Sequence, residues 1–332
     1  MARKSLPNYI KHGTTLSQIY RPTAHYVRLI GKALCCVLFL CLTSTSIATS
    51  PRIALVIPHT TSKAQIIYDE ILAGVQLEAT TELVQFNLTS TSTEEELSNW
   101  LAEQDPSAVI TVGKSAHAKV IATNIDVPLI AGGMGSLPPG VSGVALAGDP
   151  DEFFSNARLI APQVKRIYIV YNEELNGWWI EQAELAAIRH GYELISLQAS
   201  SLKSGAKMYK KLLKESKPDT DAIWIPLVSI VPSKTVLPLV LRKAWDKHLV
   251  VFTNSPSHAK QGALFSLYPN NTSMGKQLMQ LALQQREATD SAPEVVLAKE
   301  MKRAFNWRTA SHLGLEYTLE EGAGFDRIYP VQ

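Results

Sequence analysis

The 332-residue chain has no cysteine after position 41. Its three cysteines, Cys35, Cys36 and Cys41, lie close together near the N-terminus, so the remainder has no disulfide, no thiolate metal site and no cysteine nucleophile. The sequence also lacks a Gly-x-Ser-x-Gly elbow and a His-Glu-x-x-His pair. Nothing in these motifs supports an enzyme, and no metal and no cofactor are expected. An exported α/β enzyme remains a remote alternative, because acid–base pairs assemble across a fold rather than along a chain.

Acidic residues are absent from the first 48 positions, which contain six basic side chains. The apolar run 33–42 follows the last of these, and the small polar stretch 43–48 comes after it. This order is typical of a cleavable secretory signal, and Ser46-x-Ala48 predicts cleavage before Thr49. About ten apolar residues cannot span roughly 30 Å of hydrocarbon, so a membrane anchor is disfavoured. We expect a signal peptide over residues 1–48 and a periplasmic protein.

Cys41 is the one cysteine that could alternatively carry a lipid anchor. The residues before it are Leu38-Phe39-Leu40, which place a bulky leucine where that processing site needs a small residue. The sequence therefore favours a cleaved signal over a lipoprotein.

The charge and the length of the chain bear on its partners and on its number of domains. Without residues 1–48 the chain carries 26 basic and 30 acidic side chains, a net charge of −4. This balance gives no electrostatic reason to expect nucleic acid or an anionic membrane as a partner. Roughly 280 residues suit one large or two medium domains with an ordinary hydrophobic core.

Strand and helix patterns alternate from residue 52 to residue 253. Strands are expected at 52–57, 83–88, 108–112, 128–131, 141–146, 165–171, 192–198, 222–226 and 249–253. Helices are expected at 62–80, 93–103, 115–123, 149–160, 177–190, 204–216 and 233–247, and a Gly/Pro-rich turn at 132–140. This alternation predicts an α/β fold with two Rossmann-like lobes, each a parallel sheet flanked by helices, joined by a hinge of several strands.

The lobes are expected to exchange segments. The N-terminal lobe covers 51–145, and about 270–290 returns to it. The C-terminal lobe covers 146–268, and about 291–332 crosses back.

Two stretches, 108–115 and 165–172, share one arrangement: an apolar strand ends in a small or polar turn that opens a helix. In open parallel sheets, ligands bind outside the carboxyl ends of the strands, where helix N-termini offer free N–H groups. The repeated arrangement therefore predicts two lobes that face one ligand.

The run 162–172 reads Pro-Gln-Val-Lys-Arg-Ile-Tyr-Ile-Val-Tyr-Asn. It resembles the P-x-x-K-R-I-x-x-x-Y-N segment of one family of ABC-transporter substrate-binding proteins, those related to tryptophan and tyrosine binders. Weaker matches follow in family order at 112–116, 127–130, 141–144, 261–263, 274–277 and 306–315. Together they cover nearly all of the chain from residue 52 to residue 315.

The resemblance implies a periplasmic protein with the type I periplasmic binding fold, which captures a small solute between two lobes. The protein is expected to be a monomer. Its partners would be an inner-membrane permease and a cytoplasmic ATPase. A sensor of the same fold, docking on a membrane receptor or kinase, is the alternative. The ligand-binding residues expected from matched turns and from strand ends are His59, Thr60, Ser115, Ala116, Asn172, Trp178, Ser229 and Asn254.

Two departures from the family pattern change the expected solute. The family has an aspartate in the turn after residue 226, where this chain has Leu227-Val228-Ser229, and another after residue 130, where it has glycine-rich sequence. Loss of an aspartate removes a natural partner for a ligand ammonium group. A less charged or more apolar solute is therefore expected, stacking on Trp178 or Trp179.

Several of these residues also have plainer explanations. Gly113-Lys114-Ser115 is similar to part of a phosphate-binding loop, but Ala108 stands where that loop needs a glycine. His59 and His117 could contact a ligand or could simply be a surface and a capping histidine. Asn172 can cap a helix and contact a ligand at the same time.

Overall fold

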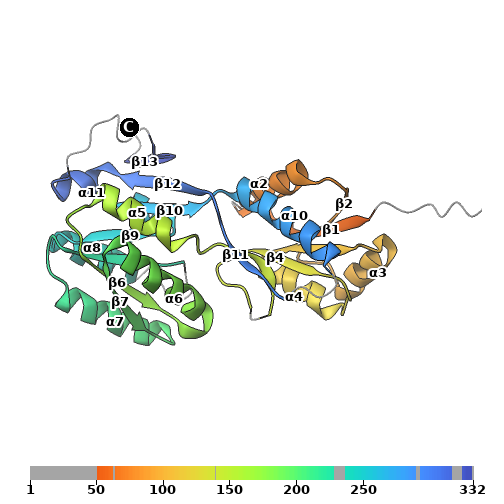
Figure 1. Ribbon diagram of the computed structural model, residues 1–332, viewed down its shortest axis with the longest axis horizontal. Helices are drawn as coiled ribbons and strands as arrows, with labels where there is room; N and C mark the ends of the chain where they lie inside the picture. Colours follow the sequence, from red (N-terminus) through yellow and green to blue (C-terminus); the bar gives the residue numbers. More distant parts are fainter. Residues whose placement is uncertain are drawn as a thin grey trace, which may run out of the picture. The chain divides into compact units, whose positions relative to one another are not determined.

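The computed structural model describes residues 51–62, 64–138, 140–227, 236–288, 292–315 and 324–330. The expected signal peptide, the three cysteines and Ser229 lie outside the described residues. Over the described part the chain forms two sheets, each covered by helices on both faces (Figure 1). The α/β architecture expected from the sequence is confirmed.

The first sheet has six parallel strands in the order β11-β5-β4-β3-β1-β2. Its strands are β1 (Arg52–Pro58), β2 (Glu82–Leu88), β3 (Ala108–Val112), β4 (Leu129–Met134), β5 (Ser142–Ala145) and β11 (Val295–Leu297). Helices α2 (Ala64–Glu78) and α10 (Asn271–Glu287) cover one face, and α3 (Glu94–Gln104) and α4 (Lys114–Ala122) cover the other (Figure 1). In β1, Ile53 and Leu55 pack toward the first pair and Ala54 and Val56 toward the second, as the two-residue period of a strand requires.

The second sheet has seven strands among the described residues, in the order β13-β12-β10-β9-β8-β6-β7. Strands β10 and β12 pair antiparallel, and every other neighbouring pair, including β12 and β13, is parallel. Its strands are β6 (Arg166–Tyr171), β7 (Glu193–Gln198), β8 (Asp221–Ile225), β9 (Val250–Thr253), β10 (Phe265–Pro269), β12 (Met301–Asn306) and β13 (Arg327–Tyr329). Its helices are α5 (Pro150–Ile160), α6 (Glu173–His190), α7 (Leu202–Glu215), α8 (Val236–Asp246), α9 (Pro256–Gln261) and α11 (Trp307–His312).

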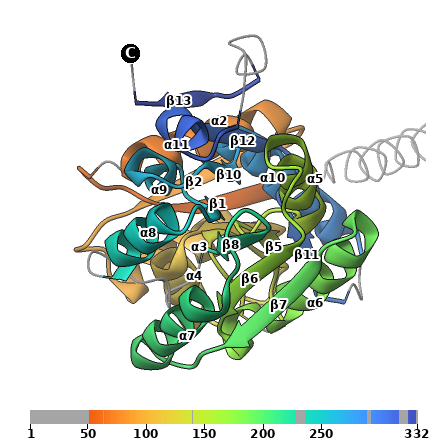
Figure 2. The ribbon, with the colours of Figure 1, turned by 90° about the vertical axis from the view of Figure 1, so that its left-hand side faces the viewer.

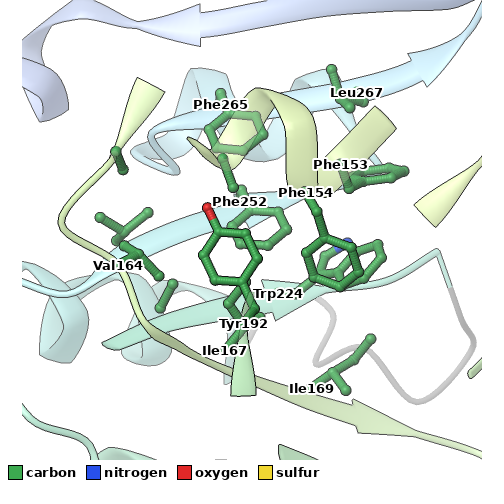
Figure 3. Close-up of a cluster of buried hydrophobic side chains, with 14 of the residues drawn as sticks. Phe153, Phe154, Val164, Ile167, Ile169, Tyr192, Trp224, Phe252, Phe265 and Leu267 are labelled. Atoms are coloured by element: carbon green, nitrogen blue, oxygen red, sulfur yellow. The ribbon is translucent and has the colours of Figure 1, made fainter. Parts of the chain in front are cut away.

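An aromatic cluster forms the core between this sheet and the helices α5 and α6 (Figure 3). The fully buried Trp224 of β8 lies 4.7 Å from Phe153 and 5.3 Å from Phe154 between ring centroids. On the sheet, Phe252 stacks on Phe265 at 5.0 Å. The ring–ring contacts add to the large apolar area that these side chains bury.

The chain passes between the two sheets three times. It leaves β5 of the first sheet for α5 beside the second, returns from β10 to α10, and leaves β11 for β12. Helix α10 then packs closely on α2, where Asn271 Nδ2 donates to Glu70 at 2.7 Å and Gln280 Nε2 donates to Glu78 at 2.8 Å. The region around 270–290 thus lies beside the first sheet, whereas β12 and β13 belong to the second.

Several boundaries differ from the sequence prediction, and for two of them the structure shows the physical reason. Strand β4 continues to Met134, although a turn was expected from residue 132. A Cβ on Gly132 would come within 2.5 Å of Leu278, so the glycine here permits close packing of α10 on the strand rather than a turn. Helix α6 begins at Glu173 rather than at residue 177, because Asn172 Oδ1 accepts from Leu175 N–H at 3.0 Å and caps the helix.

Candidate functional site

The carboxyl ends of β1 and β3 bring four of the expected ligand-binding residues to one edge of the first sheet. The two strands are parallel neighbours, with Val56 opposite Thr111. His59 and Thr60 follow β1, while Ser115 and Ala116 lie in the first turn of α4. His59 and Ser115 are exposed and Thr60 is half-buried, whereas Ala116 is fully buried, so in this structure no atom of Ala116 is accessible to a ligand.

The N-terminus of α4 is open toward this edge. Its cap residue Gly113 has φ +82°, a conformation that favours glycine, and no side chain hydrogen-bonds to the first turn as a cap. The first N–H groups of a helix have no partner within the helix, and they carry partial positive charge. With the exposed Ser115 hydroxyl and Lys114 beside them, these groups suit a carboxylate or carbonyl oxygen.

His117 lies on the same helix but is turned into the lobe. Its ring is only 4% exposed, and Nδ1 lies 3.2 Å from Thr111 Oγ1. Burial lowers its pKa, and Nε2 has no hydrogen-bond partner. A neutral, enclosed imidazole supports the packing of α4 on the sheet.

Asn172 occupies the equivalent position in the second sheet, directly after β6. It is 8% exposed, caps α6 through Oδ1, and donates from Nδ2 to Ala199 O at 3.4 Å. The capping function is therefore present, and a ligand contact by the same side chain stays a prediction. Next to it, burial and the hydrogen bond to Glu173 raise the pKa of Tyr171, which keeps that phenol protonated.

The two tryptophans of α6 have different surroundings. Trp179 is 1% exposed, donates from Nε1 to Gly148 O at 2.8 Å and lies 4.9 Å from Trp224, so it belongs to the core. Trp178 is half-buried and packs against two clusters. One is the aromatic core of the second sheet; the other consists of Ala131, Met134, Leu137 and Ala145, from β4, β5 and the turn between them. Trp178 therefore contacts residues of both sheets.

Asn254, the residue after β9, has both ends of its side chain engaged. Its Oδ1 accepts from Trp224 Nε1 at 3.0 Å, and its Nδ2 donates to Ala147 O at 2.6 Å. Ala147 lies in the passage from β5 to α5, so this 3%-exposed amide ties that passage to the edge of the second sheet.

The sequence prediction missed the apolar surface beside Trp178. Met134 and Leu137 were assigned to a Gly/Pro-rich turn, yet both are buried. Their apolar character within a turn was the available signal. Asn176 was missed as well: it is 2% exposed on α6, and its Oδ1 has no partner. Among the described residues no group of His, Cys, Asp and Glu could hold a metal ion, and no helix of that part is both long and apolar enough to cross a membrane.

No family model and no curated protein matches the sequence. Among the solved structures with a similar fold is a substrate-binding protein with adhesive properties from Clostridium difficile, in its ligand-free, open form. It has a TM-score of 0.57 and 14% identity over 83% of this chain and 98% of that one. A protein described as the ABC domain in complex with L-Trp from Streptococcus pneumonia has a TM-score of 0.54 and 16% identity, covering 84% and 99% of the two chains.

A conserved domain protein from Vibrio cholerae has a TM-score of 0.53 and 17% identity over 84% of this chain and 99% of that one. Four transcription regulators, two of them described as LacI-family proteins, match with TM-scores of only 0.42 to 0.45. The chain thus has the type I periplasmic binding protein-like fold, which ABC substrate-binding proteins share.

Proposed function

We propose that this chain is an exported solute-binding protein, not an enzyme, and that it delivers a small molecule to an inner-membrane ABC permease. The observation that carries this proposal is the position of Trp178. This side chain projects from α6 at the carboxyl edge of the second sheet and packs on strand-end residues of the first. A solute held beside it would contact both lobes and so favour the arrangement in which they are close together.

The chemistry of the two edges favours an aromatic or apolar solute with a carboxylate or carbonyl oxygen. The uncapped N-terminus of α4 supplies N–H donors, while the half-buried ring of Trp178, which packs on Met134 and Leu137, supplies apolar surface. Neither family aspartate is present to pair with an ammonium group. One fold neighbour is described as a complex with L-Trp, which agrees with an aromatic solute.

Thermal unfolding against a panel of amino acids, nucleosides, short peptides and aromatic acids tests the binding function. A true ligand at 100 times its Kd stabilises the folded state by about 2.7 kcal/mol. Trp178→Ala should reduce the ligand-induced shift. Trp100→Ala provides the control, because Trp100 is also half-buried but packs on Phe86 in the first lobe, 5.3 Å between ring centroids. Equal loss of the ligand shift in both variants would contradict the site.

Asn172 requires a pair of variants, since it caps a helix. Asn172→Ala removes the cap and should cost about 1 kcal/mol of stability without ligand. Asn172→Asp retains a good capping residue but replaces the amide with a carboxylate. If Asn172 contacts the solute, the aspartate variant should keep the helix cap and lose ligand affinity, while loss of the Nδ2 bond to Ala199 O lowers its stability without ligand.

The transport step needs its own test. If a permease and an ATPase are encoded beside the gene for this chain, vesicles containing the two should accumulate the identified solute only when the binding protein is added. A neighbouring sensor kinase in place of these two genes would support the sensing alternative, and turnover of the solute would support an enzyme.

A further inference from the structure

A cavity of about 530 Å³ lies in the second lobe, among α8, α9 and α11. Figure 2 shows these three helices one above another beside the sheet. The cavity is lined by Pro238, Leu241, Arg242, Trp245, Lys260, Gln261, Gly262, Asn306, Arg308, Thr309 and Pro330. None of these residues belongs to the candidate site described above.

The connections between strands place this cavity at the opposite edge of the sheet from that site. Trp245 lies in the last turn of α8, shortly before β9 begins, and Gly262 precedes β10. Asn306 ends β12, which is antiparallel to β10 and pairs Phe305 with Phe265 at the start of that strand. All three residues are thus near the amino ends of the parallel strands, whereas the candidate site is at their carboxyl ends.

Positive charge dominates the cavity lining. Arg242, Lys260 and Arg308 come from three different helices, and the lining includes no acidic residue. Within the described parts of the chain, no ion pair neutralises any of the three. The neighbouring Lys243 differs, because its Nζ lies 3.8 Å from Asp246.

The neutral amide and hydroxyl side chains of the lining are already engaged. Asn306 donates to Ala259 O at 2.7 Å and accepts from Thr309 N–H at 2.9 Å. The Thr309 hydroxyl donates to Gly262 O at 3.0 Å, and Gln261 donates to Ser257 O at 3.0 Å. The three cationic side chains are therefore the main donors left for a ligand, and they select an anion.

Trp245 gives the cavity a rigid aromatic wall. Its ring stacks on His312 with centroids 3.6 Å apart and planes within 6°, and the two residues also share a hydrogen bond from His312 Nε2 to Trp245 O at 3.0 Å. Arg308 lies over the same indole at 5.5 Å. Pro238, Leu241 and Pro330 add apolar surface, and the volume is within the range typical of small-molecule sites.

We propose that this cavity is a second binding site, for a small organic phosphate whose apolar ring packs against Trp245 while its oxygens contact Arg242, Lys260 and Arg308. Three converging cations match an anion with more than one negative charge, and the guanidinium groups can bind phosphate oxygens in pairs. The site is independent of the solute site at the carboxyl edges, so it does not depend on the function proposed above.

Calorimetric titration at low salt with 1-naphthyl phosphate, 1-naphthol and inorganic phosphate tests the proposal. The naphthyl phosphate should bind at least about tenfold more tightly than either fragment, because it alone can contact both the cationic side chains and the ring of Trp245. Arg242→Gln, Lys260→Gln and Arg308→Gln should each weaken its binding about tenfold or more. Lys243→Gln is the matched control, one residue from Arg242 but paired with Asp246, and should bind like the unmodified protein.

Because the three cationic side chains are exposed, we expect the three glutamine variants to fold normally. Thermal unfolding of each variant without the probe checks this. Four results would overturn the proposal. They are absence of binding to the unmodified protein, equal binding of inorganic phosphate (an adventitious ion only), equal loss of binding in Lys243→Gln, and loss of binding in Trp178→Ala, which would place the probe at the other site.

Discussion

At the scale of single residues, Asn254 links the strand edge to the passage between the sheets, and its structural and binding functions can be separated. Asn254→Ala leaves Trp224 Nε1 and Ala147 O without partners inside the protein. Two buried unsatisfied groups should lower the free energy of unfolding by about 2–5 kcal/mol in a denaturant titration. The exposed Asn87→Ala should change it by less than about 0.5 kcal/mol.

If Asn254→Ala instead keeps its stability and loses only the ligand-induced shift, the residue is a solute contact, as the sequence predicted. The present geometry engages both ends of its amide, so we expect the loss of stability.

The buried His117 and the half-buried His258 should make stability depend on pH near neutrality. Burial lowers the pKa of His117 and of His258, so both stay neutral in the folded protein below the ordinary value of about 6.5. Unfolded chains bind those protons, and the free energy of unfolding therefore falls as the pH decreases below about 6.5. The slope should reach at most about 1.4 kcal/mol per pH unit for each histidine.

Denaturant titrations from pH 7.5 to about 5, just below the ordinary histidine pKa, measure this slope. The double variant His117→Gln, His258→Gln should have a flatter profile, whatever its absolute stability. A slope that does not change in the double variant would assign the pH dependence to other groups.

At the scale of helices and strands, the pair α2 and α10 depends on two glycines where the backbones touch. A Cβ on Gly275 would overlap Ile71 O, and one on Gly74 would overlap Thr272 O. Gly275→Ala must therefore push the helices apart and should cost about 3 kcal/mol or more. In Gly177→Ala, the added methyl meets only the flexible Glu173 carboxylate, and the better helix propensity of alanine should make this control neutral or slightly stabilising.

Circular-dichroism melting of both variants compares these effects. Similar melting temperatures for Gly275→Ala and Gly177→Ala would show that α10 can move away from α2 without loss of stability.

Elements with strong local signals could be predicted from the sequence. Strands β3 and β8 are buried along their whole length, and their sequences are mostly apolar, with Thr111 in β3 and Asp221 at the start of β8 as the exceptions. The capping box at Thr93 marks the start of α3. The extension of β4 through Gly132 could not be predicted from the sequence, because it depends on packing against α10, which is far away along the chain. The strands β11 and β12 were not predicted either. Strand β11 has only three residues, and β12 joins the second sheet antiparallel to β10, so both depend on tertiary contacts rather than on a local sequence pattern.

The candidate site divides in the same way. The ends of parallel strands can be located from strand–helix alternation, which is why residues at both edges were found. The side-chain contacts depend on partners distant in sequence: Asn254 and Ala147 are 107 positions apart. Sequence spacing therefore located the edges but not the engaged amide of Asn254 or the buried surface around Met134.

At the scale of the whole molecule, the two proposed sites differ in how many parts of the chain they involve. The solute site draws on both sheets, whereas the basic cavity lies within the second lobe. Hydrogen exchange distinguishes them, because bound ligand slows the opening of the segments it contacts. With a solute found by the thermal panel, we expect slower exchange at 113–117 in the first lobe and at 172–178 in the second.

The basic cavity supplies the internal comparison. Segments 240–246 and 258–262 should keep their exchange rates with the solute and slow with 1-naphthyl phosphate. Protection limited to one of the first two segments would contradict a solute site formed by both lobes, because a molecule bound to one sheet edge alone cannot favour their closure. With the solute, we expect slower exchange in both segments, 113–117 and 172–178, and no change around the cavity. The reason is that the N–H donors of α4 and the ring of Trp178 belong to different lobes.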